Sequence, residues 1–76
     1  MSRYRVDRVD SRTVPCGMNS ILYLGDSYQQ ALRVFERAET GKDVWNQPNP
    51  AYGVVLSSWQ GQRLTGDYVI QKEKGL

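Results

Sequence analysis

One segment of the chain reads Asp26-Ser-Tyr-Gln-Gln-Ala-Leu-Arg-Val-Phe-Glu-Arg-Ala-Glu-Thr-Gly41, and its spacing is typical of an amphipathic helix. Apolar side chains recur in it at intervals of three and four residues: Tyr28, Ala31, Leu32, Phe35 and Ala38. Polar side chains fill the opposite side, as on a helix that packs one face against a core. A lone helix of this length is marginal in water. We therefore predict a helix over about residues 27–39 that lays Tyr28, Leu32 and Phe35 on a sheet.

Both ends of this helix carry signals in the sequence. Ser27 and Gln30 have the spacing of a capping box, in which a short polar side chain accepts a hydrogen bond from a free backbone N–H. Asp26 and Gln29 offer a second capping box one residue earlier. Gly41 can adopt a positive φ beyond the last turn, which predicts that the helix ends just before it.

The segments on either side of the helix have the patterns of strands. They are Arg3–Asp10, Ser20–Leu24, Ala51–Trp59 and a last strand within Leu64–Glu73, with its clearest part at Asp67–Lys72. A loop-sized connection joins the first two, which predicts an antiparallel hairpin. In the third, Tyr52, Val54 and Leu56 share the face that should meet the helix. The prediction is an α+β fold in the order β-β-α-β-β, with a four-stranded, mainly antiparallel sheet, one helix on one face and a frayed tail at residues 72–76.

The length and composition limit the class of protein. The chain has 76 residues, the size of one domain, so residues 1–76 are treated as a single domain. Cys16 is the only cysteine, which excludes an internal disulfide and favours a reducing compartment. No apolar run is long enough for a signal peptide or a membrane span. We therefore expect a cytoplasmic protein with no membrane contact.

The sequence contains no motif for catalysis or for a bound group. It has no histidine, so with one cysteine the usual zinc sets cannot form. A nucleophile would lack its usual base, and Cys16 would lack the neighbours that activate a thiol. No glycine-rich phosphate loop is present. We expect no metal, no cofactor and no enzymatic activity.

The net charge of +2 arises in the N-terminal segment. Four arginines and two aspartates fall within the first twelve residues, whereas basic and acidic side chains balance over the rest. Two interpretations of the charges in Arg3–Asp10 stay open. They form either a solvated outer face of the first strand or a basic strip that contacts an anionic partner.

Trp45 lies in a polar loop that contains two prolines. Two interpretations stay open here as well. Val44 and Trp45 fold back over the open end of the helix–sheet core, or Trp45 is an aromatic contact for a partner, since tryptophan is enriched among interface hot spots.

Two hypotheses about function follow. The first is a non-enzymatic protein-binding module, because small interfaces rely on arginine and tryptophan. Its candidate contact residues are Arg3, Arg5, Arg8, Trp45, Trp59 and Arg63. The alternative is a small RNA- or single-stranded-DNA-binding domain, in which bases stack on sheet-face aromatics beside the arginines. Those aromatics are Tyr23, Trp59 and Tyr68. A homodimer also stays open, should the second sheet face be apolar.

The chain is small, contains no histidine and includes the strand–turn–helix segment Leu22-Tyr-Leu-Gly-Asp-Ser-Tyr-Gln-Gln-Ala-Leu-Arg-Val-Phe35. This layout resembles the small accessory proteins that phages and mobile elements encode to block host machinery, such as anti-CRISPR proteins and inhibitors of host RNA polymerase. The resemblance implies a stoichiometric inhibitor that occupies a host protein or ribonucleoprotein complex in the bacterial cytoplasm. It carries over no functional residue.

Overall fold

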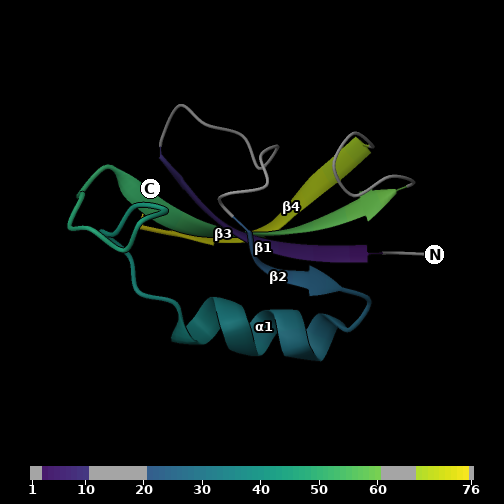
Figure 1. Ribbon diagram of the computed structural model, residues 1–76. Helices are drawn as coiled ribbons and strands as arrows, with labels where there is room; N and C mark the ends of the chain where they lie inside the picture. Colours follow the sequence, from purple (N-terminus) through teal and green to yellow (C-terminus); the bar gives the residue numbers. More distant parts are fainter. Residues whose placement is uncertain (1–2, 11–20, 61–66, 76) are drawn as a thin grey trace.

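The computed structural model describes residues 3–10, 21–60 and 67–75, which form one antiparallel sheet and one helix (Figure 1). The strands are β1 (Arg3–Asp10), β2 (Ile21–Gly25), β3 (Tyr52–Gln60) and β4 (Asp67–Lys74), and the helix is α1 (Tyr28–Arg37). The sheet order is β2-β1-β3-β4, and each neighbouring pair is antiparallel. The predicted α+β fold, its element order and the β1–β2 pairing are therefore confirmed.

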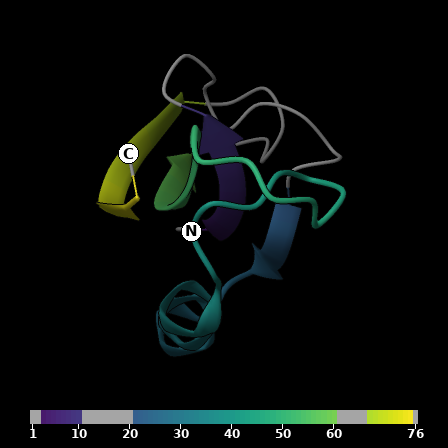
Figure 2. The same cartoon turned by 90° about the vertical axis from the view of Figure 1, so that its left-hand side faces the viewer.

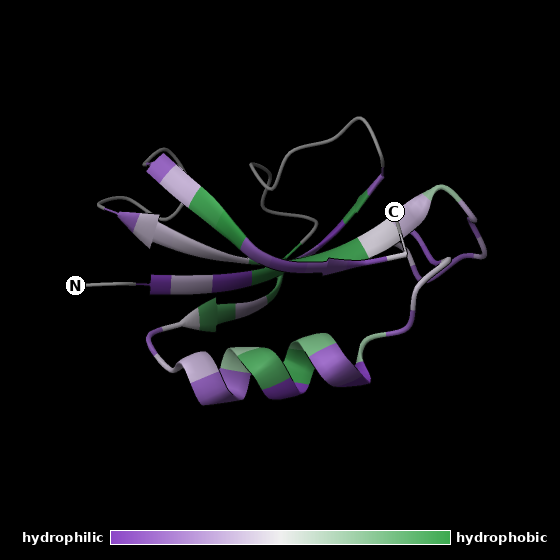
Figure 3. Cartoon of the chain, turned by 180° about the vertical axis from the view of Figure 1, so that it is seen from behind, coloured by the Kyte–Doolittle hydropathy of each residue, from purple (hydrophilic) through white to green (hydrophobic). Residues whose placement is uncertain are grey.

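Helix α1 covers one face of the sheet, where it packs against β1, β2 and β3 (Figure 2). The buried side chains between helix and sheet are Val6, Ala31, Phe35, Val54 and Leu56. Figure 3 shows the hydrophobic residues of α1 in its middle turns. The prediction that Val54 and Leu56 face the helix is confirmed, and burying each such side chain contributes roughly 1.5–3 kcal/mol.

The first turn of α1 is less buried than the spacing predicts. Phe35 is 7% exposed and Leu32 is partly buried, but Tyr28 is 38% exposed. The ring of Tyr28 meets the ring of Tyr4 edge-on, with 5.4 Å between centroids, so only one side of it is covered. The prediction that Tyr28 is a core residue was wrong, because the residue stays 38% exposed at the edge of the helix–sheet contact.

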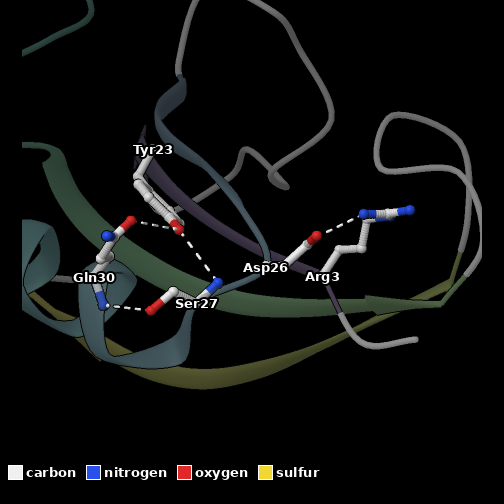
Figure 4. A network of polar contacts seen from close by, with 5 residues as sticks. All are labelled: Arg3, Tyr23, Asp26, Ser27 and Gln30. Atoms are coloured by element: carbon white, nitrogen blue, oxygen red, sulfur yellow. Dashed lines mark hydrogen bonds and ion pairs between the residues drawn. The ribbon is translucent and has the colours of Figure 1, made fainter.

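A network of polar contacts holds the start of α1 (Figure 4). Ser27 is the N-cap, and its Oγ accepts from the backbone N–H of Gln30 at 3.2 Å. The backbone N–H of Ser27 donates to the Tyr23 hydroxyl at 3.3 Å, which in turn donates to Oε1 of Gln30 at 3.4 Å. The Tyr23 hydroxyl thus accepts the hydrogen bond from the N-cap N–H that the glutamine side chain accepts in a capping box. Asp26 does not cap the helix but accepts from Nη1 of Arg3 at 2.6 Å.

Removing this cap should weaken the helix start measurably. Ser27→Ala is expected to lower the free energy of unfolding by about 0.5–2 kcal/mol, because Gln30 N–H loses its acceptor. Tyr23→Phe should have a separate cost of about 0.5–1.5 kcal/mol through the lost hydroxyl. Urea denaturation followed by circular dichroism measures both. A Ser27→Ala protein as stable as the wild type would contradict this account of the cap.

The helix ends earlier than predicted. Its last residue is Arg37, and Ala38 leaves helical geometry with φ −67° and ψ 135°. Gly41 does have a positive φ, of 75°, but it lies in the loop beyond the helix. The chain therefore leaves α1 by an extended residue rather than by a left-handed glycine, and the prediction about Gly41 as the helix stop was wrong.

In β1 and β3 the sheet face opposite α1 is also buried, and it is partly polar. Its buried residues from β1 and β3 are Arg5, Asp7, Val9, Val55, Ser57 and Trp59. Arg5 and Asp7 form a two-bonded ion pair, with 2.6 Å between Nη2 and Oδ2 and 3.2 Å between Nε and Oδ1. The Arg5 guanidinium lies 4.9 Å from the Trp59 ring centroid, and Trp59 Nε1 donates to Ser57 Oγ at 2.8 Å. We call these four residues the polar cluster.

Strand β4 continues further than expected. Residues 72–74 pair with β3, so the prediction of a frayed tail was wrong for them. The ammonium of Lys74 lies 5.0 Å from the Phe35 ring centroid and donates to the Glu36 carbonyl at 3.2 Å. These contacts tie the end of β4 to α1 and keep it in the sheet.

Candidate functional site

Trp45 is the most exposed large apolar side chain of the described residues, at 73%. It lies between α1 and β3, in a segment that we call the Trp45 loop (residues 41–51). The interpretation that Trp45 covers the open end of the core was wrong, because its side chain points into solvent. The interpretation of Trp45 as a partner contact stays a prediction.

The tip of the Trp45 loop is organised by one carboxylate. Oδ1 of Asp43 accepts from the backbone N–H groups of Trp45 at 2.9 Å and of Gln47 at 3.0 Å. The Asp43 N–H donates to the Gln47 carbonyl at 3.0 Å, and Asn46, at φ 61°, donates its N–H to the Asp43 carbonyl. Asparagine tolerates this left-handed conformation better than most residues. The backbone beneath Trp45 is therefore fixed before any partner arrives.

The base of the Trp45 loop is closed by backbone hydrogen bonds. Gly41 N–H donates to the Tyr52 carbonyl at 2.9 Å, and Asn49 N–H donates to the Gly41 carbonyl at 2.8 Å. An isolated bridge pairs Lys42 with Pro48. Gly41 takes its positive φ here, where the chain turns back toward β3.

Arg8 of β1 connects the Trp45 loop to the sheet. Its Nη1 lies 3.3 Å from the Asp43 carbonyl oxygen and 3.4 Å from Oδ1 of Asn46. Both contacts are long for hydrogen bonds, but they come from one guanidinium and reach both ends of the loop's tightest turn. Arg8 was predicted to contact a partner. In the structure it binds the Trp45 loop and so supports Trp45, another predicted contact residue.

A surface ion pair flanks the loop. Nζ of Lys42 donates to Oε2 of Glu39 at 2.9 Å. The hydrogen bond from Lys42 lowers the pKa of the Glu39 carboxyl, its charge lowers it further, and Arg8 adds to the effect. Because the Glu39 side chain is 66% exposed, this pair serves mainly to orient the side chains at the start of the loop.

Replacing Arg8 with lysine should loosen the Trp45 loop without unfolding the sheet. Lysine keeps the charge but lacks the planar fork that reaches Asp43 and Asn46 together. We expect faster amide hydrogen exchange at residues 43–47 and a loss of about 1 kcal/mol in the free energy of unfolding. Exchange measured by NMR separates the two effects. Unchanged exchange rates over residues 43–47 would show that Arg8 does not hold the loop.

The other predicted contact residues are distributed differently. Arg3 is partly exposed and pairs with Asp26. Arg5 and Trp59 are buried, at 0% and 1% exposure, so neither offers a surface contact. Their burial has a physical reason, because Asp7 neutralises Arg5 and the Trp59 ring lies over its guanidinium. Neither open interpretation of the β1 charges fits Arg5 and Asp7, which are neither solvated nor exposed for contact. Arg63 and Cys16 lie outside the described residues.

The aromatic side chains considered for base stacking do not share one exposed surface. Tyr23 is bound to the start of α1 on one face of the sheet. Tyr68 and Trp59 stack on each other with centroids 4.9 Å apart on the opposite face, and Trp59 is buried. The nucleic-acid alternative would therefore have to depend on Tyr68 and Arg3 rather than on a platform of three rings.

Comparison of the chain with protein-family models, with curated proteins and with solved structures finds no match. Among the helices of the described residues, none has the length and apolar character needed to cross a membrane. The case for function thus depends on the geometry of the chain itself.

Proposed function

We propose that this protein is a non-enzymatic protein-binding module that inhibits a partner complex by occupying its surface, with Trp45 as the central contact. One observation carries the proposal: a tryptophan that is 73% exposed stands on a loop whose backbone is closed by its own hydrogen bonds. Tryptophan is among the residues most enriched at interface hot spots.

The energetics support an indole in this position. Covering the exposed part of the ring, roughly 150 Å², contributes about 3–4 kcal/mol. Ordering a flexible side chain at an interface costs about 0.5–1.5 kcal/mol, and a preformed loop avoids much of the further cost of fixing its backbone. Asp43 and Arg8 provide that order in the free protein. The same indole on a flexible loop would bind a partner more weakly.

The class of partner is supported by resemblance rather than by contacts. The layout resembles small phage and mobile-element inhibitors, which favours a bacterial protein or ribonucleoprotein complex as the target. A partner with an apolar pocket large enough for an indole fits Trp45. The polar neighbours Lys42, Asp43 and Gln47 would then form the rim of the interface.

A capture experiment tests the proposal. Tagged wild-type protein, Trp45→Ala and the matched control Gln29→Ala, which changes an exposed residue of α1, are each incubated with bacterial lysate. Bound material is identified by mass spectrometry. We expect a protein that the wild type and Gln29→Ala retain and that Trp45→Ala loses, and we expect nuclease treatment to leave the difference unchanged. Retention by all three proteins, or nucleic acid as the only retained material, would overturn the proposal.

A further inference from the structure

The two outer strands of the sheet differ in how they discourage pairing with another strand. Strand β4 carries Asp67, Lys72, Glu73 and Lys74 and has a register shift at Leu56/Ser57, which leaves Gln71 as the extra residue. Charges and bulges of this kind protect an edge from further pairing. Strand β2 has one such register shift as well, with Leu22 as the extra residue, but its sequence Ile-Leu-Tyr-Leu-Gly contains no charged residue and no proline.

Strand β2 also exposes apolar side chains. Leu22 is 38% exposed and Leu24 is 39% exposed. Leu24 pairs with Arg5, so its side chain lies on the sheet face opposite α1. Among the described residues no strand pairs with the outer edge of β2, so an incoming strand would find leucine surface beside that edge.

Strand β2 is held in place by β1 and by the start of α1. It pairs with β1 along its length, with one register shift between Val6 and Asp7. At its end, the Tyr23 hydroxyl bonds to the start of α1, and Arg3 of β1 bonds to Asp26 at 2.6 Å. These contacts fix the strand before any partner binds, which reduces the entropy cost of docking.

We propose that the outer edge of β2 binds an extended segment of a partner protein by strand addition. In this mode, backbone hydrogen bonds give affinity and alternate side chains give specificity. The proposal goes beyond the Trp45 site and does not rest on it, because none of the residues that form the β2 edge belongs to the Trp45 loop.

The chemistry of the segment follows from the two sides of β2. On the side away from α1, the exposed Leu24 side chain would pack against an apolar residue of the bound segment. On the α1 side, Gln30 accepts a hydrogen bond from Tyr23 of β2, so the Gln30 flank of the helix faces this strand. Arg37 lies seven residues after Gln30, on the same flank, and is exposed. The segment should therefore alternate apolar residues with carboxylates.

A peptide segment suits this edge better than a second copy of the chain does. Five residues of strand extend only about 17 Å. A stable dimer interface buries roughly 1,200 Å² or more, which a five-residue edge alone does not supply. A short extended segment needs no larger surface, since its contacts are the strand itself and the side chains on either side.

Peptide titration tests the inference. The probe is the capped peptide acetyl-Val-Glu-Val-Glu-Val-amide, added to ¹⁵N-labelled full-length protein and followed by NMR. We expect saturable shifts at Ile21–Gly25 and near Arg37, with Kd on the order of 100 µM. The peptide with a central proline loses a backbone donor and should bind at least tenfold more weakly. The peptide with lysine in place of glutamate should also bind more weakly.

Matched variants locate the binding edge. Leu24→Lys places a charge on a side chain that is already partly exposed and should abolish the shifts, whereas Val69→Lys on β4 and Trp45→Ala should leave them unchanged. Absence of shifts at millimolar peptide, shifts centred on β4, equal binding by Leu24→Lys, or β2 signals that depend on protein concentration without peptide would each overturn the inference. Because Trp45→Ala is expected to retain peptide binding, failure of this proposal is distinguishable from failure of the Trp45 site.

Discussion

Asp7→Ala is expected to lower the free energy of unfolding by about 3–5 kcal/mol, because it removes the carboxylate that neutralises a fully buried guanidinium. Both Nη2 and Nε of Arg5 donate to that carboxylate. A domain of this length has a total stability of roughly 4–11 kcal/mol. The substitution should therefore remove a large share of the total stability, as measured by urea denaturation followed by circular dichroism.

A double substitution separates the ion pair from the packing around it. Replacing Arg5 with methionine and Asp7 with leucine removes both charges and keeps apolar volume in the polar cluster. Such replacements of buried pairs are often neutral or stabilising, so the double variant should be close to wild type in stability. An Asp7→Ala protein that loses less than about 1 kcal/mol would show that the pair is solvated in solution and would contradict its burial.

Phe35→Ala is the second substitution with a large expected effect. Phe35 is the largest side chain that α1 buries against the sheet, where it lies in one cluster with Val6, Val54 and Leu56. Truncating a buried phenylalanine costs about 3–5 kcal/mol, through lost burial and the cavity that remains. Lys74 also loses the ring beneath its ammonium. We expect lost helical signal and a lowered urea midpoint.

Tyr28→Ala is the matched control on the same helix. Its ring is 38% exposed and touches Tyr4 by one edge, so truncation should cost only about 0.5–1.5 kcal/mol. The spacing alone assigns Tyr28 and Phe35 equal roles, whereas the structure assigns them different ones. Equal losses for the two variants would mean that α1 sits on the sheet in another orientation.

The helix and the strands could be predicted because their signals are local. A period of three and four residues around Phe35, and alternation in β1 and β3, depend on neighbours in sequence. The burial of Arg5 and Asp7 could not be predicted in this way. The sequence of an alternating strand is the same whether its polar face is solvated or covered. The ion pair that permits burial is identified only in the structure, where both side chains lie on one face.

The candidate site was only half predictable for a similar reason. Trp45 is conspicuous in a polar loop, but composition does not say whether the ring turns inward. The backbone around it is held by Asp43, whose spacing to Trp45 and Gln47 could have suggested a side-chain-capped turn. The role of Arg8 had no local signal, since 35 residues separate it from Asp43.

Isothermal titration of the captured partner with wild-type protein and with Trp45→Ala tests the central claim most directly. If Trp45 is the main contact, its truncation should weaken binding by at least 30-fold, equivalent to about 2 kcal/mol. Trp45→Phe, which keeps an apolar ring, should recover part of that loss. Equal Kd values for the wild type and Trp45→Ala, with both proteins equally stable, would contradict the claim.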